Sequence, residues 1–158
     1  MKVNANILKW TLRMYPPLLF QRIWVIGFAE DFKSVEVKIS KSLFNKNYNG
    51  TIFGGTIFSA GDPFYAILFD QTFKKMGYNT IAWLKSAHIQ YLKPGNSDLF
   101  FKVEITDQDI HEAQIALDSV GKFVKTFKIE IKNKVGEICA IIQNEVYVRN
   151  LDKKKAIK

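Results

Sequence analysis

Cysteine and histidine are nearly missing from this chain, and their scarcity excludes several kinds of site. Cys139 is the only cysteine, so no internal disulfide framework can form, and a reducing compartment is permitted. It lies in an apolar run, which favours a buried structural thiol over a nucleophile. The two histidines, His88 and His111, are not spaced as zinc ligands. We therefore expect no metal site.

Long apolar runs and targeting segments are also lacking. The first residues include Lys2, Asn4, Asn6 and Lys9, and they contain neither the apolar core segment nor the small-residue cleavage site of a secretory signal. The apolar segment at residues 56–69 is shorter than the roughly 20 residues that cross a bilayer. We expect a cytoplasmic protein without a transmembrane segment.

Two common catalytic loops are absent as well. Residues 50–55 lack the Lys-Ser or Lys-Thr pair of a phosphate loop, and no G-x-S-x-G nucleophile elbow occurs. Acidic side chains are outnumbered by 15 to 23, which gives a net charge of +8, but the lysines are scattered and form no recognition helix. We expect no nucleic-acid partner, and a basic surface also steers a polyanionic ligand such as coenzyme A.

What is present fits a single domain. The chain has 158 residues, of which 47% are apolar and 24% charged, and no linker or repeat divides it. We expect one domain over residues 1–152, with an N-terminal helix in residues 1–15 packed on it, and a solvated basic tail over residues 153–158. The apolar face expected to pack over the sheet consists of Ile7, Trp10, Thr11 and Met14.

Hydrophobic periodicity gives the order of the remaining elements. A capping box at Thr106-x-x-Asp109 predicts a short second helix over residues 107–119. Alternating or β-rich runs predict strands over residues 22–30, 35–39, 79–92, 99–106, 123–132 and 137–149. One long helix flanked by antiparallel strands predicts an α+β fold in which a curved sheet of about six strands wraps a central helix.

The chain is organised around residues 47–73, where a glycine-bearing loop runs into a helix that is apolar on all sides. Such a helix is buried in a core or inserted in a membrane, and we expect the rest of the chain to wrap it. Asp62 is the only charge between residues 56 and 69. A buried carboxylate needs a partner or a raised pKa, so Asp62 either lines a wet site or pairs with a distant Lys or Arg. Pro63 is expected to kink the helix at that point.

This stretch resembles the signature of hotdog-fold acyl-CoA thioesterases, of the phenylacetate-pathway and 4-hydroxybenzoyl-CoA type. The resemblance spans about residues 16–149 and is nearest to an uncharacterised branch of that superfamily. Residues 88–94 (His-Ile-Gln-Tyr-Leu-Lys-Pro) resemble the stretch that follows the helix in those proteins. The motif is carried by Asn47, Gly50, Phe53, Gly54, Gly55 and Asp62. Phe53 stands where the characterised enzymes usually have His.

The resemblance and the helix start together suggest roles for these residues. The N–H group of Gly54 would hold the thioester carbonyl oxygen, and Gly55 would open space beside it, although two glycines also suit a tight helix entry. Asp62 would act as general base or as nucleophile. Asn47 would fix the catalytic water or the carboxylate, or serve only as a turn residue. Phe53 would line an acyl tunnel or belong to the core.

The spacing of Gly54 and Asp62 predicts a shared site. Eight residues of helix separate them, which is a rise of ~12 Å, so one thioester cannot touch both within one subunit. Two antiparallel central helices would bring Gly54 of one chain to Asp62 of the other, and the resemblance implies such a homodimer or a dimer of dimers. We expect hydrolysis of a coenzyme A or acyl-carrier thioester without a cofactor. A non-catalytic acyl-CoA or fatty-acyl binding module and a basic protein that binds nucleic acid or a membrane surface remain alternatives.

Overall fold

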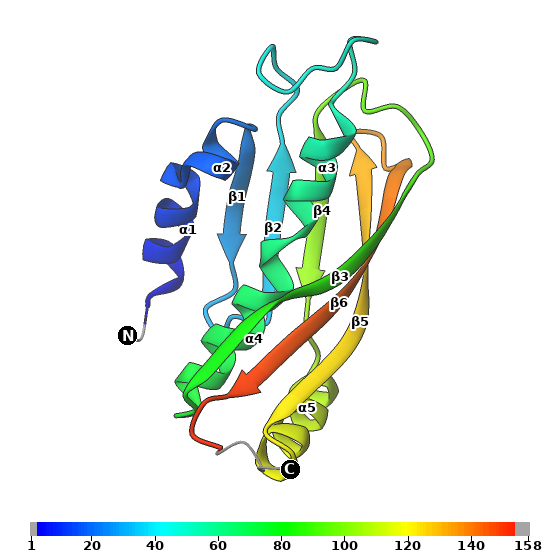
Figure 1. Cartoon of the computed structure of the whole chain (residues 1–158). Coiled ribbons are helices and arrows are strands. Elements are labelled where there is room, and N and C mark those ends of the chain that lie inside the picture. The colour runs from blue at the N-terminus through cyan, green and yellow to red at the C-terminus, as the bar shows by residue number, and fades with distance from the viewer. Residues whose placement is uncertain (1–2, 154–158) are drawn as a thin grey trace.

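One antiparallel sheet of six strands forms the body of the protein, in the order β1-β2-β4-β5-β6-β3. The computed structural model describes residues 3–153. The sheet curves around a long helical segment, as Figure 1 shows. The predicted α+β architecture is therefore confirmed. The strands are β1 (Ile23–Phe28), β2 (Ser34–Ile39), β3 (Thr80–Tyr91), β4 (Leu99–Glu104), β5 (Lys122–Asn133) and β6 (Ile138–Asn150).

The central helix is built from two segments that meet at Asp62. Pro63 occupies the first turn of the second segment, where its missing N–H group breaks the hydrogen-bond ladder, as the sequence predicts. The helices are α1 (Ala5–Met14), α2 (Pro16–Leu19), α3 (Gly54–Gly61), α4 (Pro63–Lys75) and α5 (Asp107–Ser119).

The sheet covers only one side of α3 and α4, which corrects the expectation that the rest of the chain wraps the whole helix. Buried pairs of residues alternate along it with pairs that solvent reaches. The buried pairs are Thr56–Ile57, Ala60–Gly61, Phe64–Tyr65, Leu68–Phe69 and Thr72–Phe73. The opposite side carries Phe58, Asp62, Ala66 and Ile67, and we call it the open stripe. Its apolar residues explain why the sequence looks apolar all round.

Strands β4 and β5 separate soon after they meet, and the central helix fills the gap. Only two residue pairs join them, Leu99 with Asn133 and Phe100 with Lys132. Further along, the Tyr65 hydroxyl of α4 donates to the Lys128 carbonyl at 3.1 Å, and its ring stacks on Phe127 with 4.6 Å between centroids. A side chain from the helix thus replaces a missing rung of the sheet.

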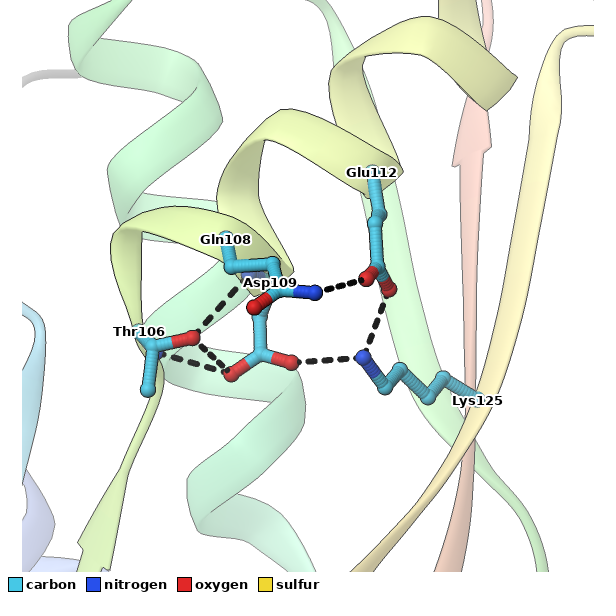
Figure 2. Close-up of polar contacts among 5 residues, drawn as sticks. All are labelled: Thr106, Gln108, Asp109, Glu112 and Lys125. Carbon is cyan, nitrogen blue, oxygen red and sulfur yellow. Dashed lines mark hydrogen bonds and ion pairs between the residues drawn. The ribbon is translucent and has the colours of Figure 1, made fainter.

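Helix α5 begins as the sequence predicts and is tied to the sheet by its first turn. The Thr106 hydroxyl accepts from the Asp109 N–H group at 3.1 Å, and Asp109 Oδ2 accepts from the Thr106 N–H group at 2.8 Å. Lys125 of β5 reaches across to Asp109 at 2.8 Å and to Glu112 at 2.6 Å, as Figure 2 shows. The capping box and its lysine partner fix where the helix lies.

The two edges of the sheet differ. At one edge α1 lies beside β1 (Figure 1), and the Arg13 Nε donates to the Val25 carbonyl at 2.8 Å. At the other edge β3 pairs only with β6 among residues 3–153, so one side of this strand of 12 residues is open. The molecule therefore has one covered edge and one open edge.

Helix α1 faces the opposite way to the sequence prediction. Leu12 packs against the core, whereas the face expected on the sheet points outward, with Trp10 54% exposed. The helix is apolar on two sides, and the outward residues form the more continuous stripe, which is why periodicity selected them. Its outward residues are Ile7, Trp10, Thr11 and Met14.

No helix among the described residues is long and apolar enough to span a membrane. The predicted basic tail, residues 153–158, lies outside the described residues except for Lys153.

Candidate functional site

The loop between β2 and α3 is anchored by a buried asparagine. The Asn45 amide nitrogen donates to the Gln21 carbonyl at 2.8 Å and to the Ser40 carbonyl at 2.9 Å. Its main-chain carbonyl accepts from the Phe53 N–H group at 2.7 Å, immediately before α3 begins. Asn45 therefore sets the position at which α3 begins. The sequence alone does not single it out, because it stands among other polar residues of the same loop.

Asn47 closes the same loop upon itself. Its side-chain oxygen accepts from the Thr51 N–H group at 3.1 Å, and its amide nitrogen donates to the Thr51 hydroxyl at 2.9 Å. Gly50 lies between them with φ of +75°, a conformation that glycine adopts without strain. These contacts favour the turn role that the sequence left open for Asn47.

The start of α3 offers two unused backbone donors. The N–H groups of Gly54 and Gly55 donate to no acceptor within residues 3–153, and no side chain caps the helix. The Phe53 carbonyl already accepts from Thr56 and Ile57. Free N–H groups at the positive end of a helix are suited to an oxygen that gains negative charge.

Tyr91 of β3 holds this helix start from the side. Its hydroxyl donates to the Gly54 carbonyl at 2.8 Å. Its ring lies so close that a Cβ added to Gly54 would be 3.1 Å from it. Partial burial raises the pKa of the Tyr91 hydroxyl, which keeps it protonated as a donor. Sequence analysis did not assign Tyr91 a role, although it lies within the quoted residues 88–94.

Gly55 does not leave open space in this subunit, because the ring of Phe53 occupies it. A Cβ added to Gly55 would be 2.3 Å from the Phe53 ring, so a larger residue there would require that exposed ring to move. Phe53 itself is 56% exposed and lies outside the cavity beside Gly54. Its proposed place in an acyl tunnel stays a prediction.

A cavity of about 330 Å³ brings Asn47 and Gly54 together with residues from the β3–β4 connection. Its walls include Ile57, Tyr91 and Lys93. The Lys93 ammonium pairs with Glu137 at 2.5 Å. Asp62 does not line this cavity. A larger cavity, of about 770 Å³, lies over the β4–β5 gap and contains none of the predicted site residues.

Asp62 is exposed on the open stripe, not buried as expected. It makes no hydrogen bond or ion pair with any other residue in the described part of the chain, so no distant Lys or Arg neutralises it there. The surrounding protein partly dehydrates the carboxyl group and raises its pKa. An unpaired acid with a raised pKa is suited to accepting a proton.

The backbone that carries Asp62 is pinned to the sheet. Asn144 of β6 is fully buried, and its amide nitrogen donates to the Gly61 carbonyl at 2.7 Å. Gly61 also packs against Ile142, which a Cβ at Gly61 would approach to 2.4 Å. Both contacts hold the helix break where Asp62 projects outward.

The described residues contain no group of three or more His, Cys, Asp or Glu side chains arranged to share a metal ion. The site consists of two N–H donors at the start of α3, from Gly54 and Gly55, and the unpaired carboxylate of Asp62. These groups lie on the same helical segment, about eight residues apart in the chain.

A family model described as "Domain of unknown function (DUF4442)" matches residues 5–148. The chain belongs to this family. Among curated proteins, none matches the DUF4442 chain.

Several solved structures share the fold of this DUF4442 protein. A Pseudomonas aeruginosa protein described as a probable thioesterase has a TM-score of 0.84 at 13% identity, covering 95% of this chain and 98% of that one. A Haemophilus influenzae thioesterase has a TM-score of 0.70 at 11% identity, covering 97% and 95%. The Escherichia coli PaaI protein of the phenylacetic acid degradation operon has a TM-score of 0.62 at 16% identity, covering 94% and 96%.

These likenesses confirm the hotdog fold predicted from residues 47–73, and at such identities they establish the fold alone. The helix that defines the fold is the α3–α4 segment, with the curved sheet around it (Figure 1).

Proposed function

We propose that this DUF4442 protein is an acyl-CoA thioesterase whose active site forms between two subunits. The observation that carries the proposal is the pairing, on one helical segment, of unused N–H groups at Gly54 and Gly55 with an unpaired carboxylate at Asp62. Several proteins of the same fold are named thioesterases, which supports the same class of reaction here.

The distance between these groups requires a second subunit. Gly54 and Asp62 are separated by a helical rise of ~12 Å, too far for one thioester group to contact both. Two features support a two-fold dimer: the open stripe of α3 and α4 is partly apolar, and β3 has a free edge beside it. Antiparallel packing of two stripes would place Asp62 of one protomer near Gly54 of its partner.

The proposed chemistry uses only protein groups and water. The Gly54 and Gly55 N–H groups stabilise the carbonyl oxygen as it gains charge, and the carboxylate of Asp62 either takes a proton from the attacking water or attacks the carbonyl carbon itself. With water as the nucleophile, the C–S bond then breaks and the thiol leaves with the proton that Asp62 took from the water. With Asp62 as the nucleophile, the C–S bond breaks to give an acyl-Asp62 anhydride and a thiolate that takes a proton from solvent, and water then hydrolyses the anhydride to release the acid and restore the carboxylate. The reaction needs no metal or organic cofactor, and coenzyme A or an acyl carrier is the leaving group. We retain the prediction of a cytoplasmic location.

The test is turnover of a panel of acyl-CoA thioesters with short, long and aromatic acyl groups, followed by release of free thiol. We expect release with at least one class. Asp62→Asn should abolish it while the circular dichroism spectrum stays unchanged, because the amide cannot take a proton or attack. Full activity of Asp62→Asn, or no release from any thioester, would contradict the proposal.

The raised pKa of Asp62 predicts that pH changes the activity and the stability of the wild-type protein in opposite senses. Activity should fall as pH decreases through that raised pKa, because the base becomes protonated. Stability should behave in the other sense: the folded-state pKa lies above the ordinary value of 3.8, so stability decreases as pH rises through the interval between them. The inactive Asp62→Asn variant should therefore unfold at a higher temperature than wild type at neutral pH, which a thermal scan measures.

A second function, acyl-CoA binding without turnover, is favoured by one observation. Phe53 replaces the usual His, and its ring lies over Gly55 beside the free N–H groups. Binding of an acyl-CoA by calorimetry with no thiol release would select this function over hydrolysis.

A further inference from the structure

The outward face of α1 is apolar and has no partner within the described chain. Ile7 is 59% exposed and Met14 66% exposed, with Trp10 between them. The face continues to the end of α2, where the C-cap residue Phe20 is 66% exposed. Side chains of this size are rarely left in water as a contiguous group without a binding role.

The loop after β2 extends this face. Leu43 and Phe44 are exposed at its tip, and the Arg22 guanidinium lies 4.8 Å from the centre of the Phe44 ring. The hydrogen bond from Asn45 to the Gln21 carbonyl holds the loop against the end of α2. Figure 1 shows α1, α2 and this loop along one side and one end of the molecule. We call this surface the α1–loop face; its apolar members are Ile7, Trp10, Met14, Phe20, Leu43 and Phe44.

The charges on the α1–loop face are of one sign. Residues 3–29 and 37–61 contain no Asp or Glu, whereas they contain Lys9, Arg13, Arg22 and Lys46. Two cations stack on its exposed tryptophan: Arg13 lies 4.9 Å and Lys9 6.0 Å from the Trp10 ring. Two acids from other segments lie at its borders: Glu30 shares a cavity with Lys9 at the beginning of α1, and Asp98 accepts from the Lys41 N–H group at 3.0 Å where the loop leaves β2. Cationic groups flanking large apolar side chains match an anionic amphiphilic surface.

We propose that the α1–loop face docks on the surface of an anionic phospholipid bilayer. Ile7, Trp10 and Met14 enter the boundary between headgroups and acyl chains, about 5–10 Å deep, as interfacial helices do. Arg13 and Arg22, whose side chains already lie along aromatic rings, contact the lipid phosphates.

A bilayer fits this face better than a second copy of the chain. A second copy would bring the same cations together, because a two-fold contact places identical surfaces against each other. The face also adjoins β1, which stands at the other end of the strand order from β3, where the open edge offers subunit pairing. Docking through α1 thus leaves the open edge free.

The experiment is co-sedimentation of the full chain with vesicles of phosphatidylcholine, compared with vesicles of phosphatidylcholine mixed with phosphatidylglycerol. We expect binding only to the anionic vesicles, weakened by added salt because the charges are exposed. The variant Ile7→Ser/Trp10→Ser/Phe20→Ser should lower the partition coefficient roughly tenfold or more, since the inserted apolar area is removed.

A matched variant elsewhere makes the comparison sharp. Ile115→Ser/Val120→Ser/Val135→Ser removes three side chains of similar exposure from α5, from its C-cap and from the β5–β6 turn, outside the α1–loop face, and should bind as wild type does. Trp10 reports insertion directly: in a Trp24→Phe/Trp83→Phe background its fluorescence should be quenched by vesicles that contain brominated acyl chains.

Three results would overturn the proposal. The first is no preference for anionic vesicles, and the second is an equal loss of binding in both triple variants. The third is a smaller particle mass by light scattering for Ile7→Ser/Trp10→Ser/Phe20→Ser without vesicle binding by wild type, which would make the face a subunit interface. None of these results depends on thioesterase activity.

Discussion

At the scale of single residues, Gly54 gives the sharpest test of the proposed reaction. It is the first residue of α3, a position where proline is well tolerated, and the preceding Phe53 is extended with ψ of 132°, as a residue before proline prefers. Gly54→Pro therefore removes the N–H donor with little change in the backbone. We expect kcat for thioester hydrolysis to fall by ~10²–10³, the loss typical of one donor to the charged oxygen.

The matched control is Gly54→Ala, which retains the N–H group. Both variants crowd the Tyr91 ring to a similar degree, since a Cβ at this position lies 3.1 Å from it. Hydrolysis by Gly54→Ala should stay much closer to wild type than hydrolysis by Gly54→Pro. Equal rates for the two variants would mean that the Gly54 N–H group does not contact the substrate.

Single residues also show where sequence analysis reached its limit. The sequence selects Asp62 because it is the one charge in an apolar helix, and the structure leaves it unpaired among residues 3–153. Its burial was predicted wrongly, because an apolar stripe looks the same whether it faces a core or an uncovered surface. The ring of Phe53 over Gly55 and the Tyr91 contact to Gly54 depend on three-dimensional packing, and no spacing in the chain encodes them.

At the scale of elements, the attachment of α5 depends on Asp109. Burial alone would raise the pKa of Asp109, but hydrogen bonds from Lys125 and Thr106 outweigh it and hold the pKa below its ordinary value of 3.8. Asp109→Asn should lower the free energy of unfolding at neutral pH by about 2 kcal/mol, the range for hydrogen bonds to a charged group. Urea unfolding monitored by circular dichroism measures the change.

The effect should depend on pH in a definite sense. The stabilisation by Asp109 is complete above its ordinary pKa of 3.8 and is lost as pH falls through the lower folded-state pKa. The difference in the free energy of unfolding between wild type and Asp109→Asn should thus become smaller in acid. The control is Asp107→Asn in the same helical turn, whose side chain is 86% exposed and pairs with Lys33 only at the surface. A constant gap, or an equal loss for Asp107→Asn, would contradict the assignment to Asp109.

The helices differ in how well the sequence predicts them, and the reason is local. The bounds of α5 follow from Thr106 and Asp109, which lie three residues apart and contact each other, so the sequence contains the whole signal. The extent of α1 is equally local, because the Asn4 side chain caps its first turn by accepting from the Asn6 N–H group at 2.8 Å. Its orientation is not local, because Leu12 faces inward only through contact with distant parts of the chain. Interactions between neighbours in sequence are thus predictable, and the choice between two apolar faces is not.

At the scale of the whole molecule, the proposed site requires two subunits, and mixing inactive variants tests this. Asp62→Asn and Gly54→Pro each damage both sites of a homodimer. In a mixed dimer both changes fall in one site, and the other site is intact. Random exchange of subunits should therefore restore about a quarter of wild-type activity, since half of the dimers are mixed and each has one working site.

The mixture should be compared with each variant alone after the same unfolding and refolding. Light scattering should give the mass of two or four chains. No recovery of activity although mixed dimers form, as shown by a tag on one variant, would mean that Gly54 and Asp62 do not act in a shared site. A monomeric protein would exclude the proposed site outright.

The contrast between the two edges of the sheet limits what the chain can assemble into. The β1 edge is covered by α1 and bonded to Arg13, so it accepts no further strand, whereas β3 can accept one. A subunit with only one open sheet edge cannot pair with a further copy at both ends of its sheet. Once two copies have joined, nothing remains on which a third can add a strand, and growth into fibres stops at the first step.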